Sequence, residues 1–326
     1  GIVSAGGAGK VTAEWMINGE VNEDVFSLDI TRFEKFHSET NFIINRAAES
    51  LGNQYAMHWP YKQQKTSRNI KTFPYHDLLK KEGACFGQVA GFESPLWYAI
   101  DGEKPEFKYS FGYQNWYKSA QNETVNTRKN VGFFELTPFA KFEIEGEAAY
   151  SSLQYLCSND IKNNDGTITY TQMLNSKGGI EADLSVTCIS KNKFRIITGS
   201  GVREHDKKHI LRYLDQDVKF TDITDSYSCF GIFGPESRSL LTQMVGNEFE
   251  NNKFPFGTGK FLKINNIDIW FQRLSYVGEL GWELYIPIKE SKKIYEIINN
   301  IGKNFNMVHA GRLAMDIMRM EKGYLH

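Results

Sequence analysis

The stretch Y-T-Q-M-L-N-S-K-G-G-I-E-A-D, from Tyr170 to Asp183, is the part of the sequence on which the fold interpretation depends. It predicts a short strand, a tight turn at Gly178-Gly179, and a second strand over Leu184 to Ile189. Two adjacent glycines let the backbone turn sharply or approach a ligand closely, because neither carries a Cβ. Asp183 stands where the second strand begins, so its carboxylate either faces water in a plain hairpin or belongs to a ligand site.

Length, composition and net charge exclude some classes of partner. The chain has 326 residues, a formal net charge of −1 and 41% hydrophobic residues, which fits two domains or one large domain with an appendage. No basic patch points to a nucleic acid, and the apolar runs are too short to span a bilayer, so we expect neither nucleic acid nor membrane as a partner. The four cysteines have no metal-like spacing and are interpreted as reduced thiols of a cytoplasmic protein.

Two histidines and the N-terminal glycines are only weak indications of a metal site and of a phosphate-binding loop. His205 and His209 stand four residues apart on a predicted helix among charged neighbours, which favours a solvated face over a metal site. The opening G-I-V-S-A-G-G-A-G-K predicts a glycine-rich turn before a helix over Val11 to Asn18. A phosphate-binding loop would need a glycine at Ser4 and a serine or threonine after Lys10, and the glycine spacing also differs from GxGxxG.

Beyond the central stretch, short strands alternate with helices. Strands are predicted where β-branched and apolar residues dominate, over 183–188, 193–197, 218–223, 229–233, 261–274 and 282–288. Helices are predicted over 147–156, 203–214, 237–245, 291–300 and 309–322. Because many neighbouring strands form antiparallel hairpins, the sequence predicts an α+β fold rather than a doubly wound parallel sheet.

Two motifs carry a family resemblance. Tyr170, Met173-Leu174-Asn175, Gly178-Gly179 and Asp183 have the order and spacing of the folate-site signature of the glycine-cleavage T-protein. The run S-Y-V-G-E-L-G-W-E-L at 275–284 resembles a second loop of that family. The whole chain resembles the dimethylglycine/sarcosine dehydrogenase family, whose C-terminal half is T-protein-like. The resemblance implies a T-protein-like (aminomethyltransferase) folate-binding fold with mixed and antiparallel sheets and ferredoxin-like elements.

The resemblance also implies a site. Tyr276 and Glu283 would hold the pterin of tetrahydrofolate, Tyr170 would be a further cofactor-binding residue, and Asp183 would be catalytic. One carboxylate can accept the two adjacent donors of a reduced pterin, N3–H and the 2-amino group. Asp183 would handle the proton released during one-carbon transfer. Glu181 lies two residues earlier on the same predicted strand face and is the next candidate for that role.

The N-terminal residues resemble the last loop and helix of the family's flavin half. This implies that residues 1–36 are a remnant of an FAD-dependent oxidoreductase domain, 37–71 a connector, and 72–326 the T-protein-like folate-binding domain, with truncation expected at both ends. FAD would belong to the intact enzyme, with the missing flavin domain as a partner. The chain alone is not expected to oxidise an amine.

The implied function is capture of a one-carbon unit. An enzyme of this family removes hydride from a small N-methyl amine, dimethylglycine or sarcosine, and the folate half would trap the iminium carbon as 5,10-methylenetetrahydrofolate before it hydrolyses. A non-catalytic folate-binding regulatory protein, a T-protein-like aminomethyltransferase or demethylase, and a domain that has lost its ligand remain alternatives. Met315 in place of a T-protein arginine, and Ala182 in place of a second acidic residue, favour the dehydrogenase branch.

Overall fold

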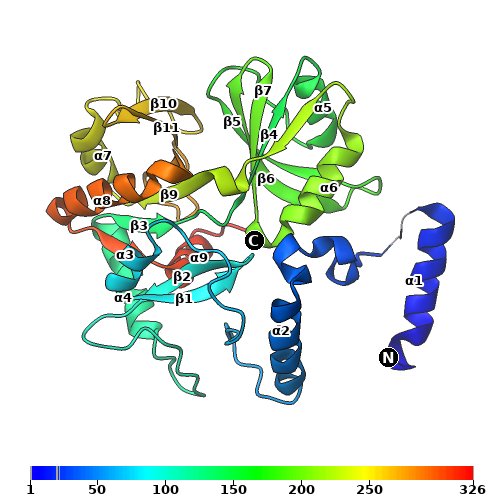
Figure 1. Ribbon diagram of the computed structural model, residues 1–326. Helices are drawn as coiled ribbons and strands as arrows, with labels where there is room; N and C mark the ends of the chain where they lie inside the picture. Colours follow the sequence, from blue (N-terminus) through cyan, green and yellow to red (C-terminus); the bar gives the residue numbers. More distant parts are fainter. Residues whose placement is uncertain (1, 20, 22, 326) are drawn as a thin grey trace.

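The computed structural model describes residues 2–19, 21 and 23–325, so Gly1 and His326, the outer limits of the expected domains, lie outside the described residues. Two large β-sheets stand beside each other, and a two-stranded sheet lies to one end of them (Figure 1). Helices cover the outer faces of the two large sheets, and the N-terminal segment extends away from them. The α+β class predicted from the sequence is confirmed.

The larger sheet has six strands in the order β10-β11-β12-β9-β3-β13. They are β3 (Gly132–Glu135), β9 (Tyr227–Phe233), β10 (Gly259–Ile264), β11 (Ile267–Gln272), β12 (Gly281–Pro287) and β13 (Val308–Ala310). All neighbours pair antiparallel except β13, which is parallel to β3. Helices α7 (Ser237–Val245) and α8 (Ser291–Gly302) pack on one face, where alternate strand residues form the largest apolar core.

The second sheet has five strands in the order β5-β6-β7-β4-β8, all antiparallel. They are β4 (Ala140–Glu145), β5 (Ile168–Leu174), β6 (Ile180–Ser190), β7 (Lys193–Thr198) and β8 (Lys219–Asp222). Helices α5 (Ala149–Leu156) and α6 (Arg203–Tyr213) share a core with one face of this sheet, to which β6 contributes Ala182, Leu184 and Val186. Because side chains alternate along a strand, Asp183 points to the other face.

The uncovered faces of the two large sheets turn toward each other. Ile189 and Ile197 of the five-stranded sheet pack against a core formed by the second face of the six-stranded sheet and by helix α9 (Arg312–Glu321). The Thr187 hydroxyl donates a hydrogen bond of 2.8 Å to Oε1 of Gln272, which joins β6 to β11. The space between the sheets is therefore bordered by polar as well as apolar residues.

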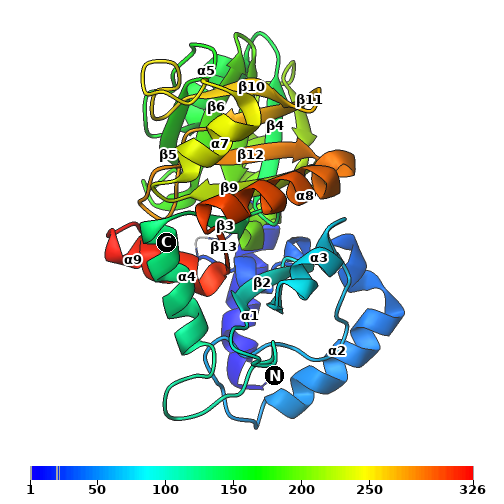
Figure 2. The same ribbon diagram turned by 90° about the vertical axis from the view of Figure 1, so that its left-hand side faces the viewer.

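The third part of the fold surrounds the hairpin of β1 (Ala84–Val89) and β2 (Phe92–Tyr98). Figure 2 shows it below the large sheets, with α3 (His76–Lys81) and α4 (Tyr117–Lys129) close to it. The Glu123 carboxylate of α4 accepts the backbone N–H of Tyr98 at 2.6 Å and of Gly311 at 2.8 Å, which fixes the start of α9 against β2. Burial raises the pKa of Glu123 to about 8.

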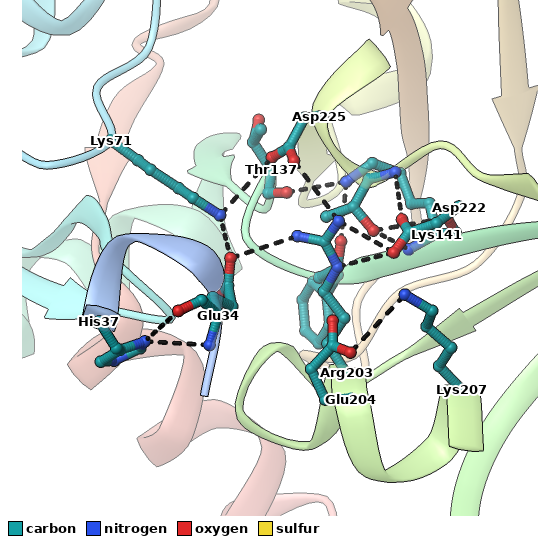
Figure 3. Close-up of polar contacts among 12 residues, drawn as sticks. Glu34, His37, Lys71, Thr137, Lys141, Arg203, Glu204, Lys207, Asp222 and Asp225 are labelled. Carbon is teal, nitrogen blue, oxygen red and sulfur yellow. Dashed lines mark hydrogen bonds and ion pairs between the residues drawn. The ribbon is translucent and has the colours of Figure 1, made fainter. Parts of the chain in front are cut away.

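The N-terminal segment contains α1 (Ala5–Asn18) and α2 (Thr40–Asn53). Short 3-10 helices complete the chain: Ile2–Ser4, Phe26–Leu28, Ile30–Arg32, Lys35–Ser38, Ser200–Val202, Thr224–Ser226, Ile288–Glu290 and Lys303–Phe305. The Glu34 carboxylate fastens the segment, because it pairs with Lys71 and lies 3.6 Å from the Arg203 guanidinium (Figure 3). Arg203 in turn pairs with Asp222 at 2.9 Å and Asp225 at 3.4 Å.

Three predicted elements differ from the observed ones. The strand predicted over 261–274 is a hairpin, because Asn265 and Asn266 turn the chain with φ of 47° and 64°, a conformation that asparagine tolerates. The helix predicted from His309 begins only at Arg312, because residues 308–310 pair with β3. The glycine-rich turn at the N-terminus is the first part of α1. No helix in the described part of the chain is long and apolar enough to cross a membrane.

Candidate functional site

Asp183 and Tyr170 contact each other directly, as their place in one hairpin suggested. The Tyr170 hydroxyl donates to Oδ2 of Asp183 at 2.8 Å, and Nε2 of Gln172 donates to Oδ1 at 2.8 Å. Gln172 stands opposite Asp183 in the register of β5 and β6. Each carboxylate oxygen therefore accepts one hydrogen bond from β5, while the carboxylate remains exposed to solvent. Partial burial, with the nearby Asp183 carboxylate, raises the pKa of Tyr170 to about 12.

Glu181 does not share the face of Asp183, and the sequence-based expectation on this point is wrong. In the register of β5 and β6, Met173 pairs with Ala182 and Leu174 pairs with Ile180, so Glu181 is left without a partner. A bulge of this kind redirects a side chain that would otherwise follow the alternation. The Glu181 carboxylate consequently reaches α6, where its Oε2 lies 3.2 Å from Nε2 of His205.

His205 is a partly buried residue with two acidic partners, so its interpretation as part of a solvated face is also wrong. Its Nδ1 lies 2.9 Å from Oδ1 of the buried Asp206, on the side opposite the Glu181 contact. The hydrogen bond to Asp206 raises the pKa of His205, an effect that burial opposes and that Glu181 and Asp24 reinforce. No group of three or more metal-binding side chains occurs among the described residues.

The Gly178-Gly179 turn closes on a side chain of the hairpin. Oδ1 of Asn175 accepts the backbone N–H groups of Lys177 and Gly179, both at 2.9 Å. Gly178 has a φ of 79°, a conformation that favours glycine, and a Cβ at Gly179 would lie 2.8 Å from Nδ2 of Asn175 and would displace that side chain. The close approach that the two glycines allow is thus to Asn175.

Glu283 lies on β12 in a different environment. Its Oε2 accepts the Tyr285 hydroxyl at 2.7 Å and Nε2 of Gln272 at 3.5 Å. Gln272 is itself buried, and its Oε1 accepts the Thr187 hydroxyl of the facing sheet. Burial raises the pKa of Glu283 above its ordinary value, and the hydrogen bonds from Tyr285 and Gln272 oppose that effect. Glu283 thus belongs to a network that spans the two sheets, apart from the Tyr170–Asp183 pair.

Tyr276 lies on the loop between β11 and β12. Its hydroxyl donates to the backbone carbonyl of Leu325 at 2.7 Å, and its ring lies 6.2 Å from that of Tyr324. Burial raises the pKa of Tyr276, an effect that the charge of Arg319 opposes and that the charges of Asp316 and Asp183 reinforce. A ligand that accepts a hydrogen bond from Tyr276 would have to replace the Leu325 carbonyl.

A cavity of about 240 Å³ adjoins the same loop, lined among others by Arg273, Gly278 and Tyr324. None of the four predicted site residues lines it. The predicted site residues lie instead on the hairpin of β5 and β6, on β12 and on the loop that precedes β12.

Arg312 is a further positively charged residue and is partly buried. It begins α9, and burial lowers its pKa, while the charges of Asp316, Glu135 and Tyr276 oppose this. Met315, which the resemblance placed at the position of a T-protein arginine, is buried in the core between α9 and the six-stranded sheet. The other arginine of α9, Arg319, donates to Oδ1 of Asp316 at 3.1 Å.

Sequence reasoning missed Gln172 and Gln272, and it interpreted His205 as part of a solvated face. Gln172 could have been found, because it lies two residues from Tyr170 and therefore on the same face of β5. Gln272 gave no comparable signal, and neither did the contact of His205 with Glu181, since these partners lie in other elements.

The fold and the site define an α+β protein whose two facing sheets each present a carboxylate to the space between them. Comparison with known proteins shows the family to which this fold belongs. The family model "GCVT N-terminal domain" matches residues 75–326, and the model "FAD dependent oxidoreductase central domain" matches residues 18–72. The chain belongs to the GCVT N-terminal domain family.

Two relatives extend over the whole chain. It is 34% identical to 4-methylaminobutanoate oxidase (formaldehyde-forming) from Paenarthrobacter nicotinovorans, over 100% of this chain and 40% of the relative. It is 32% identical to mitochondrial dimethylglycine dehydrogenase from Rattus norvegicus, over 99% of this chain and 38% of the relative. The resemblance to the dimethylglycine/sarcosine dehydrogenase family is thus confirmed. The chain spans about 40% of the length of these relatives.

The T-protein-like fold is also confirmed. The structure of the glycine cleavage system aminomethyltransferase T from Bartonella henselae matches with a TM-score of 0.65 and 22% sequence identity. The match covers 79% of this chain and 64% of that protein.

Proposed function

We propose that the chain binds tetrahydrofolate between its two large sheets and is the part of an N-methyl amine dehydrogenase that captures the one-carbon unit. The observation that carries the proposal is the Asp183 carboxylate. It is exposed toward the space between the sheets and is held by one donor on each oxygen, Tyr170 and Gln172. The membership of the chain in the GCVT N-terminal domain family supports a folate ligand.

The residues present fit a reduced pterin. Both hydrogen bonds that Glu283 accepts end on Oε2, and Oε1 accepts none from the described residues. A partly buried carboxylate with a free oxygen is suited to the adjacent N3–H and 2-amino donors of a pterin, since charge-assisted bonds are short and strong. Tyr276 and Arg312 would complete the polar border of the ring. When bound, tetrahydrofolate supplies the amine nitrogens that accept a one-carbon unit.

Asp183 would act as the proton acceptor during that transfer. Its exposed carboxylate can pass a proton to water, and the two bonds from β5 fix the plane in which its remaining lone pairs point. Tyr170 would contact the ligand from the same strand face. Glu181 is not available for this role, because His205 and Asn175 occupy its carboxylate.

We propose the division of the chain stated from its sequence: residues 1–36 as part of an FAD-dependent oxidoreductase domain, 37–71 as a connector, and 72–326 as the folate-binding domain. FAD would act in the flavin half, with dimethylglycine, sarcosine or another small N-methyl amine as substrate, and a cytoplasmic location is part of the proposal.

The test is a calorimetric titration of the purified chain with tetrahydrofolate. We expect saturable binding of one ligand per chain. p-Aminobenzoylglutamate, which lacks the pterin, is the control ligand and should bind far more weakly. Absence of saturable tetrahydrofolate binding by the folded chain would overturn the proposal.

A further inference from the structure

His205 joins three parts of the fold that are distant in sequence. Its Nδ1 lies 2.9 Å from Asp206 on its own helix, and its Nε2 lies 3.2 Å from Glu181 on the bulge of β6. The Phe26 ring of the N-terminal segment packs edge-on against the imidazole, with the ring centroids 4.8 Å apart. Helix α6 thus holds the Gly178-Gly179 hairpin on one side and the N-terminal segment on the other.

Both ring nitrogens of His205 face carboxylate oxygens, so both contacts are satisfied only when both nitrogens carry a proton. A neutral imidazole has one N–H and can serve one of the two carboxylates. Asp206 is fully buried, and its other oxygen accepts the Thr198 hydroxyl, so it cannot turn to water. The Glu181 side chain is 27% exposed and is therefore the partner that loses its contact when His205 is neutral.

The Glu181 contact extends to the tip of the hairpin. Oε1 of Glu181 accepts Nδ2 of Asn175 at 2.9 Å. Asn175 closes the turn, because its Oδ1 accepts the N–H groups of Lys177 and Gly179 and its backbone carbonyl accepts the N–H of Gly178 at 3.0 Å. The strand that leaves this turn carries Asp183, two residues after Glu181.

Two ion pairs fix the N-terminal segment to the same helix. The Lys208 ammonium lies 2.9 Å from Asp29, and Arg203 at the start of α6 lies 3.6 Å from Glu34 (Figure 3). The hairpin and the N-terminal segment therefore both contact helix α6, and His205 of that helix contacts both of them.

We propose that His205 is a positioning residue, which as an imidazolium ties Glu181 to α6 and so holds the Gly178-Gly179 hairpin beside Asp183. Deprotonation of His205 releases Glu181 and loosens the turn. Its influence on folate binding rests on the proposed function, whereas its influence on the hairpin does not.

The charged groups around His205 set the direction of the pH dependence. Asp206 and His209 face it from α6, Glu181 from β6 and Asp24 from the N-terminal segment. The acidic groups raise the pKa of His205. The contact between His205 and Glu181 is therefore present below that pKa and is lost as the pH rises through it.

Amide hydrogen exchange tests the proposal in the whole chain. The reporters are the amides of residues 177–179, compared between variants at each pH so that the intrinsic rate cancels. In the wild type, protection of these amides should fall about two- to fivefold as His205 loses its proton, the effect of a partly exposed ion pair. NMR titration of the histidine ring signals locates that pH.

Three variants separate positioning from a merely structural role. His205→Gln should show the low protection at every pH, and His205→Arg, which keeps its charge and two donors, should restore protection without pH dependence. Glu181→Gln should loosen the turn while leaving the Asp206 contact in place. His58→Gln, at an exposed histidine outside α6, is the matched control and should keep the wild-type profile.

Wild-type protection at residues 177–179 in His205→Gln, or an unchanged pH profile in His205→Arg, would overturn the proposal. Tetrahydrofolate titrations of the same variants add a second measurement, in which affinity should follow hairpin protection with pH. If tetrahydrofolate fails to bind every variant, the proposed function is wrong, and the exchange data still decide the role of His205.

Discussion

A carboxylate lies on the hairpin of β5 and β6, and another lies on strand β12. The two carboxylates differ in their exposure to solvent and in their hydrogen-bond partners. Asp183 is exposed, and both of its hydrogen-bond donors come from the neighbouring strand of its own hairpin. Glu283 is partly buried, and its partner Gln272 connects it to Thr187 in the other sheet. Burial raises the pKa of Glu283.

In the proposed function, this difference would give separate roles to two residues of the same chemical class. An exposed carboxylate in a fixed orientation exchanges protons with water at little cost, which suits a group that handles a proton. A desolvated carboxylate gains most when a ligand supplies hydrogen-bond donors, because its own burial is costly until it is paired. We therefore expect substitutions at Asp183 to affect transfer and substitutions at Glu283 to affect affinity.

The largest expected effect is that of Asp183→Asn. In the full-length enzyme it should lower the formation of methylenetetrahydrofolate by roughly 10²–10⁴-fold, the usual contribution of a positioned acid–base group, and release formaldehyde instead. Amine oxidation and tetrahydrofolate affinity should change little, because asparagine has the shape of aspartate, its Oδ1 can accept Nε2 of Gln172 and its Nδ2 can donate to the Tyr170 hydroxyl oxygen. The measurement is the ratio of the two one-carbon products per amine oxidised.

The exposed Asp268 of the β10–β11 hairpin provides a matched control, and Asp268→Asn should behave as the wild type. If Asp183→Asn keeps the wild-type product ratio, then Asp183 does not handle the proton, and the proposed difference between the two carboxylates is wrong.

The next effect is that of Glu283→Ala on affinity. Removing this acceptor leaves the two pterin donors unpaired between the sheets, at a cost on the order of 1–3 kcal/mol. Tetrahydrofolate should then bind roughly tenfold more weakly or worse in a calorimetric titration. Glu296→Ala, on the exposed side of α8, is the control and should bind as the wild type. An unchanged affinity in folded Glu283→Ala protein would contradict the assignment.

The smallest expected effect is a pH dependence of tetrahydrofolate affinity. Because burial raises the pKa of Glu283, this carboxylate takes up a proton at a higher pH than an ordinary glutamate and then loses acceptor capacity. Affinity should therefore decline as the pH falls from neutral toward the pKa of an ordinary glutamate, about 4.3, and the decline should begin above that value.

Titrations of Glu283→Gln across the same range isolate this contribution. The variant should bind more weakly at neutral pH, and its remaining pH dependence should be smaller than that of the wild type. A Glu283→Gln profile that falls as steeply as the wild type would assign the pH dependence to another group.

The sequence by itself determined those features of the fold and the site that depend on the spacing of residues along the chain. Strand alternation and the turn at Gly178-Gly179 placed Tyr170 and Asp183 on adjacent strands, and hairpin signals predicted the α+β class. The two motifs identified the family, because they preserve residue order along the chain.

Only the tertiary structure decided which residues from distant segments meet. The bulge at Glu181 appears only in the register between β5 and β6, and it turns the next candidate acid away from Asp183 toward His205. The contact of Thr187 with Gln272 joins residues that are 85 positions apart in different sheets. Such contacts follow from how sheets and helices pack, and packing couples side chains whose separation along the chain leaves no periodic signal.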